Sequence, residues 1–126
     1  MKSELIHLAN QLGIHEQIIF VGVRKEIPEI MRLFDVFLFP SKKEGLGIVA
    51  IEAQASGLNC IVSDSIPKQC DMELGLIYRK PLVIQEWINS ILTIKKEKTL
   101  IDKDKILNSN FNIEENCEQL RKIYNK

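Results

Sequence analysis

Apolar residues in the first third of the chain follow two different spacings in turn. Over residues 2–13 and again over 27–34 they recur every three or four positions, which predicts two amphipathic helices. Residues 18–21 and 36–39 are unbroken apolar runs, which are typical of buried strands. The first helix should end at Gly13, because glycine is common just beyond a helix C-terminus.

The same alternation continues through the rest of the chain. Residues 46–56 are apolar on almost every face, which predicts a helix that is buried all round. Residues 59–63 and 76–78 are predicted to be strands. Two further helices are predicted, an amphipathic one over 82–97 and a last one over 113–125.

Apolar strands separated by helices indicate a parallel sheet that is covered on both faces. The expected fold class is therefore α/β, with a Rossmann-like parallel sheet and flanking helices. We expect a single partial domain, in which residues 1–97 form the Rossmann-like region and 98–126 a helical extension. Ligands of such sheets bind beyond the carboxyl ends of the strands, which directs attention to residues 22–25, 41–47 and 63–68.

Composition narrows the class of protein and its partners. The 126 residues suffice for one hydrophobic core, and Lys plus Arg equals Asp plus Glu at 17 each. This balance gives no general attraction to nucleic acid, so nucleic acid is not an expected partner. The odd cysteine number, with Cys60, Cys70 and Cys117 widely spaced, fits a reducing compartment. We therefore expect a cytoplasmic location, and no apolar signal segment is visible at residues 1–4.

One loop carries the pattern of an anion-binding site. It follows the predicted strand 36–39, and its glycines Gly45 and Gly47 bracket the start of the next predicted helix. Glycine allows the backbone to approach a ligand closely. A helix start presents unpaired N–H groups and a partial positive charge, so this loop is a candidate phosphate site.

Two glutamates flank this loop, and each has two interpretations. Glu52 is the only charge in the apolar helix, so it either faces the hydroxyls of a ligand or is a structural ion pair or an edge-exposed charge. Glu44 either contacts a ligand or forms a helix-capping pair with Ser41, since Ser-x-x-Glu is the capping-box pattern.

The spacing of these residues resembles a known family. Glu44 and Glu52 stand in Pro-Ser-x-x-Glu-Gly-x-Gly-x-x-x-x-Glu-Ala, which is similar to the signature of the large retaining GT-B glycosyltransferases, the glycosyl transferases group 1 or family 4 type. Residues 20–22, 35–41 and 53–64 resemble further family segments in the same order, and residues 63–68 resemble a capsular or exopolysaccharide-like branch.

The resemblance implies a nucleotide-sugar donor as ligand. In this family the residue at Glu44 contacts the donor sugar and is the catalytic candidate, and the one at Glu52 holds the ribose hydroxyls. Leu46 and Gly47 would offer backbone N–H groups to the distal phosphate. Arg24 lies where family members contact the base, although a solvated surface arginine is an equal alternative.

The resemblance also implies what this chain would lack. The family handles the diphosphate without a metal ion or another cofactor, so no metal site is expected. Compared with the family, we expect the acceptor domain and the first two strands of the donor domain to be missing from this chain. In the family order 3-2-1-4-5-6, residues 18–22 and 36–39 match strands 3 and 4. Those strands would then pair directly, pair through another chain, or leave a poorly stable product.

Two functional hypotheses follow from these differences. The first is the nucleotide-sugar-binding part of a glycosyltransferase of bacterial surface polysaccharide biosynthesis, of hexosyltransferase type and inactive alone. A separate acceptor-domain chain or a homo-oligomer would complete its sheet, and any membrane contact would come from the missing half. The alternative is a non-catalytic partner module or a decayed fragment of such an enzyme. The donor sugar, the base and the acceptor stay open at this stage.

Overall fold

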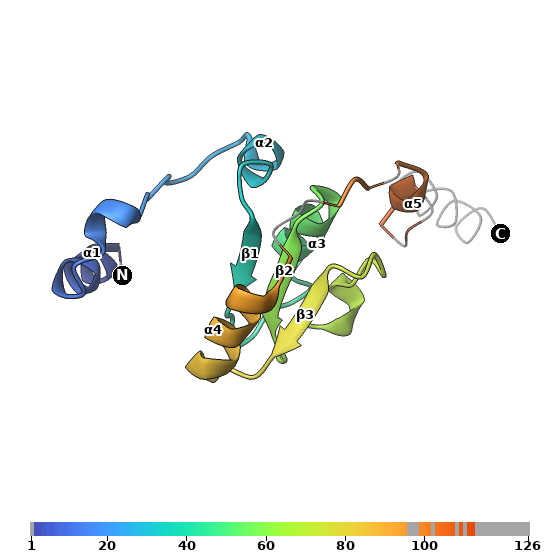
Figure 1. The fold of residues 1–126 in the computed structure, drawn as a ribbon. Coiled ribbons are helices and arrows are strands. Elements are labelled where there is room, and N and C mark those ends of the chain that lie inside the picture. The colour runs from blue at the N-terminus through green and yellow to red at the C-terminus, as the bar shows by residue number, and fades with distance from the viewer. Residues whose placement is uncertain (1, 96–98, 102, 108, 110, 113–126) are drawn as a thin grey trace.

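A three-stranded parallel sheet forms the centre of the fold (Figure 1). The computed structural model describes residues 2–95, 99–101, 103–107, 109 and 111–112. The strands lie in the order β1-β2-β3, with bounds Val36–Phe39, Asn59–Ser63 and Ile77–Lys80. This parallel sheet with flanking helices confirms the Rossmann-like α/β fold class predicted from the apolar runs.

Helices precede, separate and follow the strands, as the spacing of apolar residues predicts. No helix in the described part of the chain is long and apolar enough to cross a membrane. The predicted helix over 113–125 lies outside the described residues. The α-helices are α1 (Lys2–Gln11), α2 (Ile27–Met31), α3 (Ile48–Ala55), α4 (Ile84–Thr93) and α5 (Lys103–Leu107), and the 3-10 helices are η1 (His15–Gln17) and η2 (Lys68–Cys70).

The main core lies between one face of the sheet and helices α2 and α3. Alternate residues of β2, Cys60 and Val62, point into this core and are fully buried. Met31 from α2 and Ala50 and Ala53 from α3 fill the space against them. The small alanines allow α3 to lie close to the sheet, which fixes where its first turn sits.

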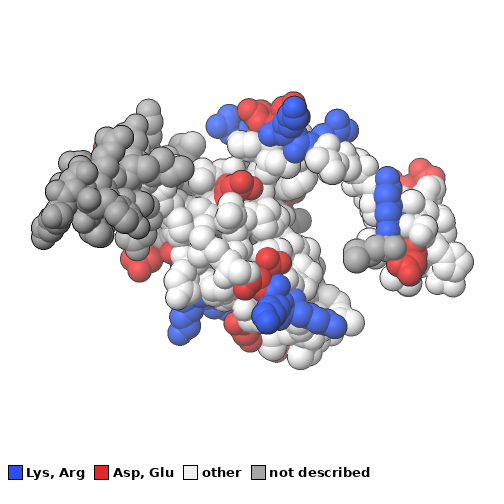
Figure 2. All heavy atoms as spheres, turned by 180° about the vertical axis from the view of Figure 1, so that it is seen from behind, with Lys and Arg blue, Asp and Glu red and all other residues white. Residues whose placement is uncertain are grey.

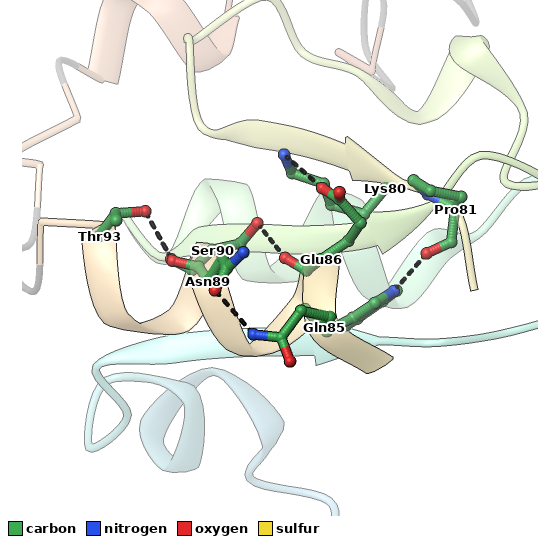
Figure 3. A network of polar contacts seen from close by, with 8 residues as sticks. Lys80, Pro81, Gln85, Glu86, Asn89, Ser90 and Thr93 are labelled. Atoms are coloured by element: carbon green, nitrogen blue, oxygen red, sulfur yellow. Dashed lines mark hydrogen bonds and ion pairs between the residues drawn. The ribbon is translucent and has the colours of Figure 1, made fainter. Parts of the chain in front are cut away.

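Helix α4 covers the opposite face, and a set of polar contacts holds it to the end of β3 (Figure 3). The indole N–H of Trp87 donates to the carbonyl of Pro81 at 2.7 Å. Lys80 and Glu86 form an ion pair at 3.9 Å. Trp87 is buried to 9% exposure, so it is a core residue of this face.

Residues 18–21 are not a strand, so the predicted strand at this place is wrong. They form an extended segment that leads from the α1 end of the chain to α2, and Ile19 is 85% exposed (Figure 1). A strand needs a neighbour to pair its N–H and C=O groups, and none of the described strands lies beside this segment. Direct pairing with β1, one of the three expected outcomes, therefore does not occur in the described residues.

Helix α3 is also less buried than predicted. Its core-facing side carries Ala50, Ala53 and Gln54, all with no exposed surface. The opposite side faces solvent, where Ile48 is 63% exposed and Glu52 is exposed as well. An apolar composition on all faces therefore does not make α3 an interior helix, because the sheet, α2 and η2 cover one side of it and leave the other side open.

Candidate functional site

The candidate loops meet at one edge of the sheet because all three strands run in the same direction. Phe39 pairs in register with Val62, and Ser63 with Lys80, so the carboxyl ends of the strands lie side by side. The loop 40–47 that follows β1 and the loop 64–67 that follows β2 begin at this edge, below the arrowheads in Figure 1.

Gly47 forms the junction between the first loop and α3. Its φ of +78° is left-handed, and it is the N-cap residue of the helix, which no side chain caps. A Cβ atom at this position would lie 3.3 Å from Ile66 Cγ2 and 3.7 Å from Cys70 Cβ, so the loop after β2 packs directly on it. Because the first N–H groups of a helix have no intrahelical acceptor, this tip can donate to an anion.

Gly45 and Leu46 lie before this junction and are more open. A Cβ atom at Gly45 would meet nothing within 4 Å, and its φ is not left-handed. Leu46 is 40% exposed. Both residues are therefore accessible from solvent at the sheet edge, which is what backbone contact with a ligand requires.

Glu44 is half-buried and bonded to Ser41. The Ser41 hydroxyl donates to Glu44 Oε1 at 2.8 Å. The capping alternative for this pair is wrong, because α3 begins at Ile48 with Gly47 as its N-cap. The bond instead holds the carboxylate of Glu44 within the loop.

The loop after β2 anchors this serine in turn. The hydroxyls of Ser63 and Ser65 both donate to the backbone carbonyl of Ser41, the second at 2.7 Å. Ser63 is the last residue of β2 and is almost fully buried. Two adjacent strand ends therefore fix the position of Glu44, an arrangement that the spacing along the chain does not reveal.

Glu52 lies about one turn into α3, on the side that faces solvent. No hydrogen bond or ion pair of its carboxylate is present among the described residues, so the structural ion pair is not observed there. Since the side chain is exposed, water can hydrate it, and the desolvation cost expected from a buried helix does not arise. Its exposure fits both the edge-exposed charge and the ligand-facing group of the two interpretations.

Arg24 is not brought to this edge. It is exposed, and its Nε donates to the carbonyl of Val21 at 2.8 Å. The segment that contains it leads into α2 at the start of β1, opposite the arrowhead where the loop 40–47 begins (Figure 1). The structure therefore gathers Glu44, Leu46 and Gly47 around one helix tip and leaves Arg24 apart.

A buried amide that the spacing of residues did not single out holds the end of η2 and the residues after it against α3. Gln54 has no exposed surface, and its Nε2 donates to the carbonyls of Ala50 at 2.9 Å and Cys70 at 2.8 Å. Its Oε1 accepts the N–H of Met72 at 3.0 Å. A single glutamine in an otherwise apolar helix was the available signal, since a buried amide must find partners.

Two buried thiols, those of Cys60 on β2 and Cys70 in η2, lie in the core next to the candidate site. Burial raises the pKa of the Cys60 thiol to about 12, with Cys70 and Asp71 adding to the effect. Burial also raises the pKa of Cys70, although the positive charge of Arg79 acts in the opposite direction. Both thiols are therefore protonated core groups at neutral pH, and neither is suited to act as a nucleophile.

Charges of both signs are mixed on the face shown in Figure 2 rather than segregated. In the described part of the chain, no three His, Cys, Asp or Glu side chains are arranged to hold a metal ion.

Comparison with known proteins gives a consistent result over most of the chain. The family model described as "Glycosyl transferases group 1" matches residues 1–108. The glycosyltransferase EpsF of Bacillus subtilis (strain 168) is 37% identical over 128 residues, which cover 98% of this chain and 33% of that protein. No solved structure gives a significant match.

Two further relatives are named as a galactosyltransferase and a mannosyltransferase. A UDP-Gal:alpha-D-GlcNAc-diphosphoundecaprenol alpha-1,3-galactosyltransferase of Escherichia coli is 30% identical over 90% of this chain and 31% of its own length. The lipopolysaccharide core biosynthesis mannosyltransferase LpsB of Rhizobium meliloti (strain 1021) is 35% identical over 50% of this chain and 18% of its own length. The chain thus spans about a third of the length of EpsF and the galactosyltransferase.

Proposed function

Because this chain belongs to the glycosyl transferases group 1 family, we propose that it forms the nucleotide-sugar-binding part of a retaining glycosyltransferase of bacterial surface polysaccharide biosynthesis. The observation that carries the proposal is the helix tip at Gly47. A left-handed glycine there leads into an uncapped helix at the carboxyl edge of a parallel sheet. That is the place and the chemistry expected for binding a diphosphate.

The backbone groups around this tip bind the diphosphate of the donor. The N–H groups of Leu46 and Gly47 donate to the distal phosphate, and the positive end of α3 stabilises the diphosphate as it leaves. Gly45 leaves room for the ligand to approach the backbone. This assignment gives the protein a way to stabilise the leaving group with its own backbone.

The two glutamates hold the sugar and the ribose. Glu44, held by the 2.8 Å bond from Ser41, polarises and orients the donor sugar. Glu52 lies about one turn into α3, and its exposed carboxylate accepts hydrogen bonds from two vicinal ribose hydroxyls. Arg24 is not part of the proposed site, because its segment lies at the other end of β1.

The experiment is a titration of the chain with UDP and GDP by calorimetry. UDP comes first, because the Escherichia coli relative is named for UDP-Gal. We expect one of the two nucleotides to bind and Glu52→Ala to weaken its binding by about a hundredfold, which corresponds to the loss of two charge-assisted hydrogen bonds of about 1.5 kcal/mol each. Glu29→Ala, which removes an exposed glutamate from α2, is the matched control and should bind as the wild type does.

The role of Glu44 is separated by comparing UDP with UDP-galactose. Glu44→Gln should leave UDP binding unchanged and remove only the extra affinity that the sugar contributes, because Glu44 is assigned to the sugar. If neither nucleotide binds the wild-type chain, the proposed function is wrong. If Glu52→Ala and Glu29→Ala bind equally well, the ribose assignment is wrong.

A further inference from the structure

The guanidinium of Arg79 spans the loop that follows β2. Arg79 lies on β3 in register with Val62, next to the point where β2 ends. Its Nη1 donates to the carbonyl of Ile66 at 2.5 Å, and its Nη2 donates to the carbonyl of Pro67 at 3.1 Å. Nη2 also lies 4.0 Å from Cys70 Sγ.

This geometry requires the planar fork of arginine. Two carbonyls from consecutive residues are bound by two different nitrogens of one rigid group, whereas a lysine ammonium is a single point charge. The side chain is partly buried, so water competes less for these bonds than it would on an open surface. Arg79 thus holds the backbone of the loop in one conformation.

The same loop forms the support under the helix tip. The Ile66 side chain of the loop is 2% exposed and lies nearest to the place where a Cβ would stand on Gly47, and Cys70 at the end of η2 also lies close to it. Gln54 ties the end of η2 to α3 through the carbonyl of Cys70. A shift of the Ile66 and Pro67 backbone would therefore move the surface on which Gly47 rests.

We propose that Arg79 is a positioning residue for the diphosphate site at the tip of α3. The inference rests on the proposed function, since it assumes that this tip binds the diphosphate. Arg79 acts through the backbone of Ile66 and Pro67 and does not itself contact the donor. Its two hydrogen bonds fix the backbone position of Ile66 and Pro67. The Ile66 side chain in turn fixes the position of Gly47, and the conformation of Gly47 determines the direction of the first N–H groups of α3.

The test compares UDP with uridine, which has no phosphate, on the full chain by ligand-detected NMR, and GDP and guanosine take their places if the wild type binds GDP instead. Arg79→Lys keeps the charge and loses the fork, and Arg79→Met loses both. We expect each variant to weaken UDP by about tenfold and to leave uridine unchanged. Lys80→Met is the matched control, because it removes a neighbouring positive charge that pairs with Glu86 and not with the loop. It should bind both ligands as the wild type does.

Each other outcome contradicts a specific part of the inference. If Arg79→Lys binds UDP normally while Arg79→Met does not, the charge and not the fork is what matters. An equal loss of UDP and uridine, or loss of the folded circular dichroism spectrum in Arg79→Lys, would show a general structural role. Normal UDP binding by both variants overturns the inference and leaves the proposed function intact. Failure of wild type to bind UDP or GDP overturns both.

Discussion

Replacing Gly47 by alanine tests the conformational argument for the helix tip. Gly47 has a φ of +78°, and the left-handed region costs an L-residue about 1 to 2 kcal/mol. The added Cβ would also stand 3.3 Å from Ile66 Cγ2, which is tighter than ordinary van der Waals contact. Since Ile66 is buried and has little room to move, we expect Gly47→Ala to lower the free energy of unfolding by about 1 to 3 kcal/mol.

Gly45 provides the matched control two residues away. Its φ is not left-handed and a Cβ would meet nothing within 4 Å, so Gly45→Ala should change the free energy of unfolding by less than about 0.5 kcal/mol. The assay is urea unfolding followed by circular dichroism and by the fluorescence of Trp87. With a slope of about 1 to 2 kcal/mol per molar urea, the Gly47→Ala midpoint should fall by about 1 M. Equal midpoints for the two variants would refute the reasoning.

Two further predictions concern buried polar and ionisable groups. Gln54→Leu should lower the free energy of unfolding by about 2 to 6 kcal/mol, because it strands the Cys70 carbonyl and the Met72 N–H without a partner. Gln85→Leu removes an exposed helix amide as a control, and an equal effect of the two changes in urea unfolding would contradict the account. Because folding raises the pKa of Cys60 from 9.0 to about 12, its contribution to stability is complete below pH 9 and is lost as pH rises from there to 12. The urea midpoint of wild type should therefore fall more between pH 8 and 10.5 than that of Cys60→Ala, and parallel curves would exclude this effect.

The spacing of apolar residues predicted some strands correctly and one wrongly. The apolar runs at 36–39 and 59–63 became β1 and β2 with those bounds. The run at 18–21 has the same composition and is not a strand, because a strand exists only when another strand pairs with it. Pairing is a property of the whole sheet, so periodicity in one segment cannot settle it.

The candidate site was likewise predicted in part. The sequence predicted the same role for Gly45 and Gly47, which was close approach of the backbone to a ligand. In the structure only Gly47 of the two has a left-handed φ and packs against Ile66. The apolar composition of α3 predicted that Glu52 is a charge in a buried helix, whereas its side of α3 faces solvent. The groups that fix the loops, Gln54 and Arg79, bond to residues 12 to 18 positions away, so no short motif contains them.

The sequence by itself determined the alternation of helices and strands, the α/β class and the place of the glycine-rich loop at a strand end. Each of these depends on residues close together in the chain, whose spacing and backbone freedom act locally. Only the tertiary structure decided which apolar run pairs, which face of α3 is covered, and how Ser63, Ser65 and Arg79 bind the two loops to one another. Those features arise from contacts between residues far apart in the chain, where packing and hydrogen bonding outweigh local preference.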